Sequence, residues 1–273
     1  MTRSPSLVRR KVRHELRRRS VTVTATRRLT PGMVRVTVAG RDLADFQAPG
    51  PADHLKLILP GADDEPVLRD YTPSAFRSAP GGPDSPVEPD SPAVQGLPEL
   101  DIDFVLHGDE GPASAWARRA APGDRVELGG PRGSFLLEQA GASAVLIADE
   151  TGFPAVARMV AALPPDVAVT ALLAPLDPAN AAYFDGADVR GADLRWFTGA
   201  SRAEDLGIAV RAVPQRPGTW FFLAGETGLL IPLRRHLRHE RGLPASQVVA
   251  QGYWKHGVVA LDHHAPLDPQ DPD

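Results

Sequence analysis

Hydrophobic and polar residues alternate along the first half of the chain with the two-residue period of β-strands. Residues 21–26 and 33–38 show this alternation, are rich in β-branched side chains, and are separated by a turn at residues 30–32. Further elements expected in this half are strands at residues 54–59, 69–72, 100–107 and 125–128 and a short helix at residues 113–120. Because short strands and turn residues follow one another closely, this half predicts a small antiparallel β-barrel.

The pattern changes near residue 140, where fully apolar strands begin to alternate with helices. The expected strands are residues 144–148, 167–173, 194–197 and 220–224, and the expected helices are residues 154–163, 203–212 and 226–241. Such an order predicts a parallel sheet covered on both faces. We therefore expect a barrel domain over residues 1–139, an α/β domain over residues 140–257, and an acidic tail over residues 258–273.

Two segments lie outside these patterns. Ten of the first 28 residues are Lys or Arg, whereas Glu15 is the single acid among them. We expect residues 1–19 to be a solvated arm beside anionic ligands; binding to nucleic acid is the disfavoured alternative, because no nucleic-acid module follows. Residues 73–99 contain seven prolines and predict a long polar loop within the barrel domain.

The composition limits the possible chemistry. The chain has 273 residues and no cysteine, which excludes disulfides, thiolate zinc sites and cysteine-ligated iron–sulfur clusters. No run of 18 apolar residues is present, and the N-terminus lacks the apolar core of a signal peptide. We therefore expect a cytoplasmic protein without membrane insertion, in which any redox reaction uses an organic cofactor.

Residues 69–72 carry the first candidate site. The planar guanidinium of Arg69 matches phosphate oxygens, and Tyr71 supplies a flat ring. Side chains alternate across a strand, so Arg69 and Tyr71 are expected to share one face while Thr72 turns the other way with its hydroxyl.

Residues 103–116 carry a second candidate site. An apolar strand leads through Gly111 to Pro112, which is expected to begin a helix and to leave the amides of Ala113 and Ser114 facing an anion. Three strand residues at alternate positions share one face: Asp103, Val105 and His107. Together the two stretches predict a pocket for a planar, phosphorylated cofactor, of which a flavin dinucleotide is the best match.

These two stretches resemble the siderophore-interacting proteins, which are flavin-dependent ferric-siderophore reductases related to the ferredoxin-reductase fold. The resemblance extends over roughly residues 8–257 and continues through residues 130–134, 148–151, 224–226 and 252–257. It implies that FAD is the cofactor and that the strand ending at His107 lines its site. Five residues are given roles by the resemblance: Arg69 at the phosphates, Tyr71 against the isoalloxazine ring, Thr72 near the reactive ring nitrogen, and Ala113 and Ser114 at the pyrophosphate.

The same resemblance implies a cationic site for an anionic ferric siderophore. The matching positions are Lys56, Arg132 and Lys255. Members of the family often have Arg at the third position; Lys255 keeps the charge but loses the planar fork of a guanidinium.

The electron donor is less well defined by the sequence. Residues 149–154 form the first strand-to-helix turn of the α/β domain and lack the Gly-x-Gly-x-x-Gly of common dinucleotide sites. We expect Thr151 to cap the helix there, with Pro154 just inside it, and to contact a nicotinamide or flavin edge. Residues 173–177 supply no basic residue for a 2′-phosphate, so NADPH, NADH and a ferredoxin all stay open as donors.

The resemblance therefore implies an FAD-dependent ferric-siderophore reductase. Hydride transfer from NAD(P)H to the flavin would be followed by single-electron steps to Fe(III), which is then released as Fe(II) because hard oxygen ligands bind it less tightly. No catalytic side chain and no resident metal are expected. Two alternatives stay open: a general NAD(P)H–flavin oxidoreductase with another acceptor, and a flavin- or siderophore-binding module without turnover.

Overall fold

The computed structural model describes residues 7–61, 65–79, 96–106, 111–139, 141–189, 191–214, 216–258, 261 and 266–272. The chain divides into two compact units, one formed by residues 12–134 and the other by residues 1–11 together with residues 135–273. Two predicted features lie outside the described residues: His107 and residues 80–95 of the expected loop.

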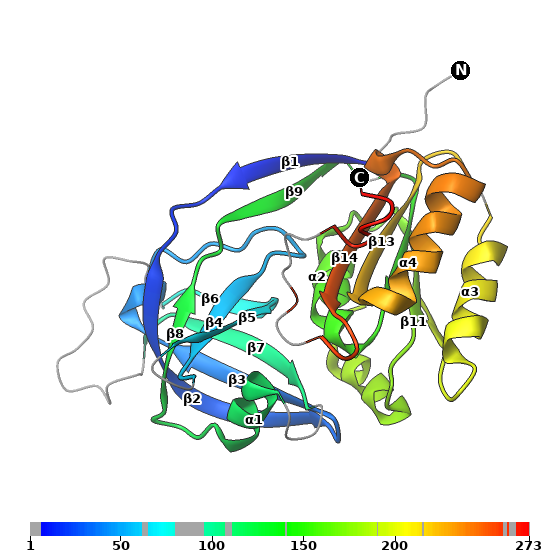
Figure 1. Ribbon diagram of the computed structural model, residues 1–273. Coiled ribbons are helices and arrows are strands. Elements are labelled where there is room, and N and C mark those ends of the chain that lie inside the picture. The colour runs from blue at the N-terminus through cyan, green and yellow to red at the C-terminus, as the bar shows by residue number, and fades with distance from the viewer. Residues whose placement is uncertain are drawn as a thin grey trace. The chain divides into compact units, whose positions relative to one another are not determined.

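The unit of residues 12–134 is built on one seven-stranded sheet (Figure 1). Its strands are β2 (Arg18–Thr30), β3 (Met33–Ala39), β4 (Leu55–Leu59), β5 (Val67–Tyr71), β6 (Pro73–Arg77), β7 (Glu99–Val105) and β8 (Arg125–Gly129). They follow the order β5-β4-β8-β2-β3-β7-β6, and every pairing is antiparallel. Strands β5 and β6 are the two ends of this order, so the predicted antiparallel barrel is confirmed as a half-barrel.

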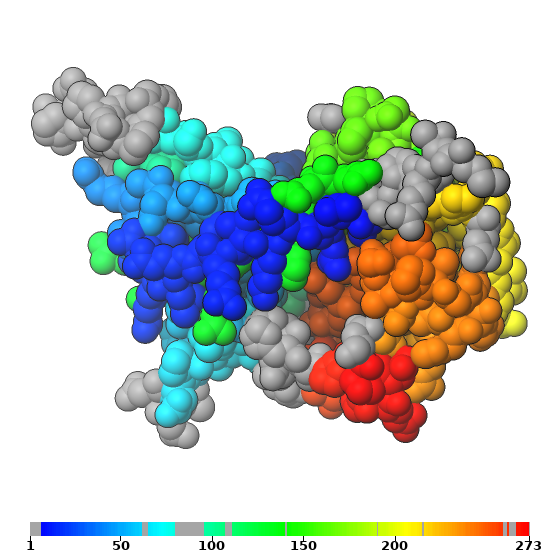
Figure 2. Space-filling model, turned by 90° about the horizontal axis from the view of Figure 1, so that it is seen from above, coloured from blue at the N-terminus to red at the C-terminus, as the bar shows by residue number. Residues whose placement is uncertain are grey.

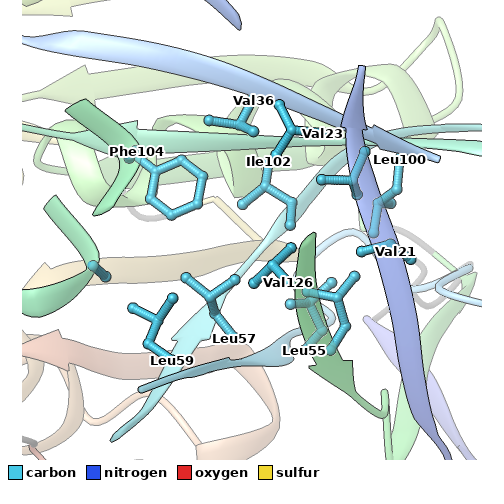
Figure 3. Packing of buried hydrophobic residues seen from close by; sticks show 14 of the residues in the cluster. Val21, Val23, Val36, Leu55, Leu57, Leu59, Leu100, Ile102, Phe104 and Val126 are labelled. Carbon is cyan, nitrogen blue, oxygen red and sulfur yellow. The ribbon is translucent and has the colours of Figure 1, made fainter. Parts of the chain in front are cut away.

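Alternate residues of these strands point into one hydrophobic core (Figure 3). Leu57 of β4 and Phe104 of β7 are fully buried. Helix α1 (Pro112–Arg119) packs Ala113 and Ala117 into the same core. Trp116 of α1 is partly buried against the same core, so packing holds α1 against the strands.

The other unit contains a five-stranded parallel sheet with the order β12-β11-β10-β13-β14. Its strands are β10 (Ser143–Ala148), β11 (Ala168–Leu173), β12 (Asp193–Trp196), β13 (Thr219–Glu226) and β14 (Val248–Trp254). Its helices are α2 (Phe153–Ala162), α3 (Arg202–Ala212) and α4 (Thr227–Arg235). The predicted parallel sheet is confirmed, although no strand was predicted at the position of β14.

Helices cover both faces of this parallel sheet, with α2 on one face and α3 and α4 on the other (Figure 1). Val145 and Ile147 of β10 share a core cluster with Leu206 of α3 and Leu230 of α4. Leu146, between them in the sequence, points to the opposite face, where α2 packs on β10. Burial of both faces explains why the sequence of β10 is apolar without alternation.

Two strands that the hydrophobic pattern did not reveal form a separate two-stranded sheet. Strand β1 (Val8–Arg13) pairs with β9 (Gly133–Gln139). Gly133 permits this pairing, because a Cβ atom there would lie 2.5 Å from the carbonyl oxygen of Val12. Part of the expected arm over residues 1–19 therefore forms strand β1 and the start of β2, although most side chains of β1 are exposed to solvent.

Two other predicted boundaries differ from the structure. Strand β6 occupies the beginning of the expected loop over residues 73–99, because its side chains find partners on β7 that lie far away in the sequence. The predicted helix over residues 226–241 ends earlier, at Arg235, and continues as a π-helical turn over His236–Glu240.

The described part of the acidic tail packs against α4, and Figure 2 shows these red residues beside the orange helix. Arg234 and Arg235 of α4 form ion pairs with Asp271 and Asp268, each with an N–O distance of 2.6 Å. Leu267 adds a hydrophobic contact with the core beneath α4. The tail is therefore part of the fold over residues 266–272.

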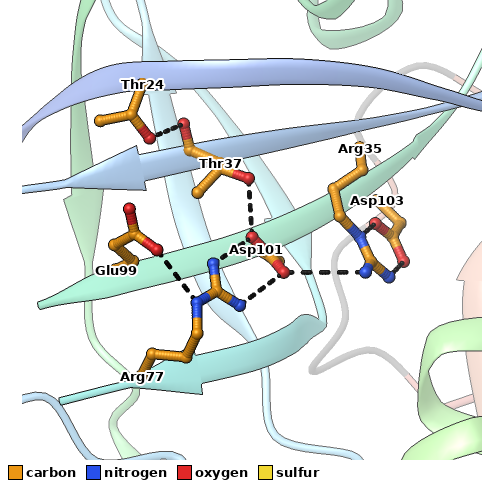
Figure 4. A network of polar contacts seen from close by, with 7 residues as sticks. All are labelled: Thr24, Arg35, Thr37, Arg77, Glu99, Asp101 and Asp103. Atoms are coloured by element: carbon orange, nitrogen blue, oxygen red, sulfur yellow. Dashed lines mark hydrogen bonds and ion pairs between the residues drawn. The ribbon is translucent and has the colours of Figure 1, made fainter.

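A network of ion pairs holds the edge strand β6 against β7 (Figure 4). Arg77 of β6 donates two hydrogen bonds to Asp101 of β7, over 2.8 and 2.9 Å, and Thr37 of β3 donates a third over 2.8 Å. Burial by itself would raise the pKa of Asp101. The hydrogen bonds from Arg77 and Thr37, with the charges of Arg77 and Arg35, outweigh it and lower that pKa below its ordinary value of 3.8.

We expect the substitution Asp101→Asn to lower the free energy of unfolding by about 2 kcal/mol, because hydrogen bonds to charged groups contribute roughly 1.5–3 kcal/mol. A lowered folded-state pKa means that Asp101 stabilises the protein above about pH 4 and that this stabilisation is lost as the pH falls through the lowered pKa. Urea unfolding at about pH 7 and about pH 2 should therefore show a larger difference between variant and wild type at the higher pH.

A control for this prediction is Glu99→Gln, which removes a carboxylate that is 37% exposed from the same network. Its cost should stay below about 1 kcal/mol, as is usual for exposed ion pairs. Equal losses for the two variants, or a difference that does not depend on pH, would contradict the role assigned to Asp101.

Candidate functional site

The motif at the end of β5 has the predicted arrangement of side chains. In the pairing of β5 with β4, Arg69 lies opposite Leu57 and Tyr71 opposite Leu55. Paired residues of antiparallel strands project to the same face, so Arg69 and Tyr71 share one face of the sheet. Thr72 follows the strand, rather than lying on it as predicted, and is 7% exposed.

Tyr71 packs on the barrel core with one side of its ring. The ring centroids of Tyr71 and Phe104 lie 4.4 Å apart at an interplanar angle of 43°, and Phe104 in turn contacts Trp116 of α1. Burial raises the pKa of Tyr71 above its ordinary value, although the charge of Arg69 acts in the opposite direction. Tyr71 is therefore a neutral, fixed aromatic ring at physiological pH.

Several polar groups around this motif have few protein partners. Arg69 donates a hydrogen bond to the carbonyl oxygen of Leu68 and, within the described ranges, pairs with no carboxylate. The hydroxyl of Thr72 makes no hydrogen bond in the part of the chain that the structure describes. The hydroxyl oxygen of Ser74, on β6, is buried and likewise has no partner there. A buried hydroxyl such as that of Ser74 normally has a partner. Together with the guanidinium of Arg69 and the hydroxyl of Thr72, it forms a donor set that fits a bound polar ligand such as a flavin nucleotide.

The N-terminus of α1 provides further donors. Pro112 occupies the first turn, which contains no acidic residue, and no side chain among the described residues caps the helix. Ser114 donates its hydroxyl to the carbonyl oxygen of Val105 over 2.6 Å, which ties the helix to the end of β7. Gly111 precedes the helix in an extended conformation. The amides of Ala113 and Ser114 therefore lie at the positive end of the helix, where a phosphate is stabilised.

The side chain of Asp103, a predicted cofactor residue, is bound within the half-barrel. Its carboxylate accepts two hydrogen bonds from Arg35, over 2.7 and 2.8 Å, and its side chain is fully buried. The side chain is therefore engaged in the network of Figure 4 rather than exposed to a cofactor. Val105, which follows on the same face, is 9% exposed.

Asp149, at the end of β10, joins the ends of three strands of the parallel sheet. Its carboxylate accepts hydrogen bonds from the amide of Thr151 over 2.9 Å, from the amide of Glu226 over 2.7 Å and from the indole nitrogen of Trp254 over 2.9 Å. The hydroxyl of Thr151 donates a fourth, over 2.5 Å. Gly225 is required beside it, because a Cβ atom there would lie 2.6 Å from the carboxylate carbon.

The predicted capping role of Thr151 is wrong. Asp149 caps the short 3-10 turn that precedes α2, while the N-cap of α2 is Gly152, which has no side chain. Thr151 instead donates its hydroxyl to the carboxylate of Asp149. Pro154 does lie in the first turn of α2, as predicted.

The other acids at this edge of the sheet also bind the chain itself. Glu150 accepts hydrogen bonds from the amide of Leu176 and the side chain of Asn180. Glu226 caps α4 through the amide of Leu229 and also accepts from the amide of His256. The oxygens of these carboxylates are therefore already occupied by hydrogen bonds within the fold.

The three cations of the expected substrate site differ in their surroundings. Lys56 donates to both carboxylate oxygens of Asp70, over 2.9 and 3.0 Å. Arg132 and Lys255 are exposed, and neither forms an ion pair among the described residues. Lys56 and Arg132 belong to the half-barrel unit, whereas Lys255 belongs to the α/β unit.

Sequence reasoning missed one cation at the edge of the parallel sheet. Arg202, in the first turn of α3, donates a hydrogen bond over 3.0 Å to the carbonyl oxygen of Ala174, just after β11. The sequence around Ala174 contains no basic residue, and Arg202 lies 28 positions further on. Only the parallel pairing of β11 with β12 brings the two together.

The fold of this chain is similar to that of solved structures with low sequence identity, and these similarities define its structural class. A ferredoxin reductase of carbazole 1,9a-dioxygenase covers 88% of this chain and 70% of its own, with a TM-score of 0.61 at 17% identity. The flavohem-like FAD/NAD binding domain of nitric oxide dioxygenase from Vibrio cholerae gives the same TM-score at 16% identity and covers 87% of this chain and 98% of its own. The half-barrel and the parallel sheet thus form a ferredoxin-reductase-like fold.

The family follows from closer similarities. Residues 22–135 match the siderophore-interacting FAD-binding domain, and residues 141–257 match the siderophore-interacting protein model. The NADPH-dependent ferric-chelate reductase of Escherichia coli K12 is 32% identical over 89% of this chain and 95% of its own. A siderophore utilization protein from T. fusca is 33% identical, with a TM-score of 0.78, and covers 94% of this chain and all of its own. The chain belongs to the siderophore-interacting protein family, and the predicted resemblance is confirmed.

Among the described residues, no helix is both long and apolar enough to span a membrane. No group of three acidic or histidine side chains in that same part of the chain is placed to hold a metal ion.

We expect Asp149→Asn to lower the free energy of unfolding by about 3 kcal/mol, because an amide group would face donors that need an acceptor and would leave some of them buried without a partner. Urea unfolding followed by tryptophan fluorescence measures this loss. Asp177→Asn is a matched control, since this exposed carboxylate caps only the amide of Ala179 and should cost about 0.5–1 kcal/mol. Similar losses for both variants would rule out a special role for Asp149.

Proposed function

We propose that this protein is an FAD-dependent ferric-siderophore reductase that takes its electrons from NADPH. The observation that carries the proposal is the donor set of the half-barrel. Arg69, Thr72 and Ser74 offer unsatisfied polar groups beside a fixed aromatic ring, in the unit that matches the siderophore-interacting FAD-binding domain. The names of two relatives support the reaction: the NADPH-dependent ferric-chelate reductase and the ferric vibriobactin reductase of Vibrio cholerae.

The residues of the half-barrel have distinct roles in this proposal. Arg69 and the amides at the start of α1, at Ala113 and Ser114, bind the phosphates. Tyr71 supports the isoalloxazine ring, and the hydroxyl of Thr72 hydrogen-bonds at its edge. When bound, FAD accepts two electrons from a pyridine nucleotide and passes them on singly. The protein therefore needs no side-chain acid or base for the reduction of iron, and we assign none.

NADPH is the proposed donor. Nucleotides bind at the carboxyl ends of the strands in open parallel sheets, and Arg202 lies at that edge beside Ala174. A guanidinium is well suited to a 2′-phosphate, and within the described residues Arg202 pairs with no carboxylate. We also propose a cytoplasmic location, because such a donor is supplied there. The ferric siderophore would be recognised by Lys56, Arg132 and Lys255, and no nucleic acid is involved.

An anaerobic absorbance scan between about 350 and 550 nm tests the proposed function. The purified protein should bind FAD, lose its flavin absorbance when NADPH is added, and regain it when a ferric siderophore follows. Recovery with other acceptors but with no ferric chelate would indicate a general NAD(P)H–flavin oxidoreductase. Flavin that no pyridine nucleotide or ferredoxin reduces would indicate a binding module without turnover, and failure to bind FAD would refute the proposal.

We expect Arg69→Gln to weaken FAD binding by roughly 10- to 100-fold, because it removes charge-assisted hydrogen bonds to phosphate. Titration of the apoprotein with FAD, followed by the quenching of flavin fluorescence, measures the dissociation constant. Arg27→Gln, an exposed change of equal charge on β2, should leave binding within about twofold. If both variants bind equally well, the contact between Arg69 and the cofactor is refuted.

We expect Arg202→Gln to raise the KM for NADPH about tenfold and the KM for NADH less than about twofold, because only NADPH has the 2′-phosphate. Steady-state reduction of a ferric chelate with each donor gives both values. Arg195→Gln, which removes an exposed cation of β12 that is paired with Asp193, should affect neither donor. An equal rise for NADH and NADPH after Arg202→Gln would assign Arg202 a structural role.

A further inference from the structure

Lys56 and Asp70 form a cross-strand ion pair on the face of the half-barrel opposite to that of Arg69. They are direct partners in the pairing of β4 with β5, and the Lys56 nitrogen lies 2.9 and 3.0 Å from the two carboxylate oxygens. Their side chains are 35% and 24% exposed. A ligand can therefore contact both side chains, whose opposite charges largely offset each other.

Strand β8, on the other side of β4, has no side chain next to this ion pair. Lys56 is paired with Gly129 of β8, and a Cβ atom added there would only just touch the lysine, at 3.7 Å from its Cβ. The lack of a side chain at Gly129 leaves the Lys56–Asp70 pair uncovered on that side. Arg132 follows three residues later in the chain and is exposed.

The three proposed substrate cations therefore do not contribute equal charge. Arg132 and Lys255 lack carboxylate partners in the described part of the chain, whereas the charge of Lys56 is balanced by Asp70. A carboxylate this close repels an anionic ligand about as strongly as the lysine attracts it. The net attraction at this position is close to zero.

Resting on the proposed function, we infer that the Lys56–Asp70 pair selects ferric siderophores of low net charge, of the trishydroxamate type, over highly charged triscatecholates. Three hydroxamate groups with one negative charge each neutralise Fe(III), whereas three catecholate groups with two each leave a trianion. A site with an intact triad of unbalanced cations would favour the trianion. The carboxylate of Asp70 removes much of the preference for the trianion, while the ammonium group of Lys56 still offers hydrogen-bond donors.

A charge-exchange experiment tests this inference. The variants are Asp70→Asn, Lys56→Gln and the double variant, and the measured quantity is the ratio of kcat/KM for a triscatecholate to that for a trishydroxamate chelate. Asp70→Asn should raise the ratio about fivefold, and Lys56→Gln should lower it about fivefold. The double variant restores the original charge and should return the ratio to within about twofold of wild type. All shifts should shrink at about 0.5 M salt, since exposed charges are screened.

Glu99→Gln is the matched control, because it removes one carboxylate from an exposed ion pair on β7, with three strands between it and β4. The ratio of kcat/KM values for the two chelates in Glu99→Gln should equal that of the wild type. If the ratio of the double variant stays as low as that of Lys56→Gln, the ligand makes a specific contact with Lys56 and the inference is overturned. A wild type whose kcat/KM is tenfold or more higher for the triscatecholate would also overturn it. Failure of the wild type to reduce any ferric chelate would instead refute the proposed function, so the two failures are distinguishable.

Discussion

The carboxylate of Asp149 accepts four hydrogen bonds at the carboxyl edge of the parallel sheet, and the local structure of that edge depends on it. Two of its donors, the amide of Glu226 and the indole of Trp254, come from strands 77 and 105 positions away. A buried carboxylate is costly unless its oxygens are satisfied. The position of Asp149 therefore forces the ends of β10, β13 and β14 into one arrangement, and Gly225 supplies the space that the carboxylate needs.

The same principle explains how a chain with a net charge of −4 can serve anionic ligands. Asp101 and Asp103 in the half-barrel are bound by arginines, and Asp149 and Glu150 in the α/β unit are bound by backbone and side-chain donors. These acids hold strands in place, and the charges of Asp101 and Asp103 are balanced by arginines. Cations such as Arg69, in contrast, keep most of their donors for a ligand. The electrostatics of the site therefore depend on the pairing of charges rather than on their sum.

The Lys56–Asp70 pair is an intermediate case. It is exposed enough to meet a ligand, yet it is balanced within itself. In a strand pair, a change of either residue alters the charge of the site without altering the core, because the opposite face carries the buried leucines of β4. Substrate preference within one fold can thus change through a single outward-facing position.

The order of strands and helices, the two sheet types and the shared face of Arg69 and Tyr71 were predictable from the sequence, because side-chain periodicity is a local property of the chain. The start of α1 at Pro112 was predictable for the same reason. Strands β1, β6, β9 and β14 were not predicted. Each of them forms because a distant partner satisfies its backbone, as β7 does for β6 and β13 does for β14.

The roles of individual charges were also decided by the tertiary structure. The sequence identified Asp103 and Thr151 as residues near a cofactor, but Arg35 and Asp149 bind them. It could not place Arg202 beside Ala174 or Asp70 beside Lys56. By itself the sequence determined the family and the cofactor. The charge that each residue offers to a ligand depends on which partner lies within about 3 Å, and only the pairing of strands far apart in the sequence fixes those distances.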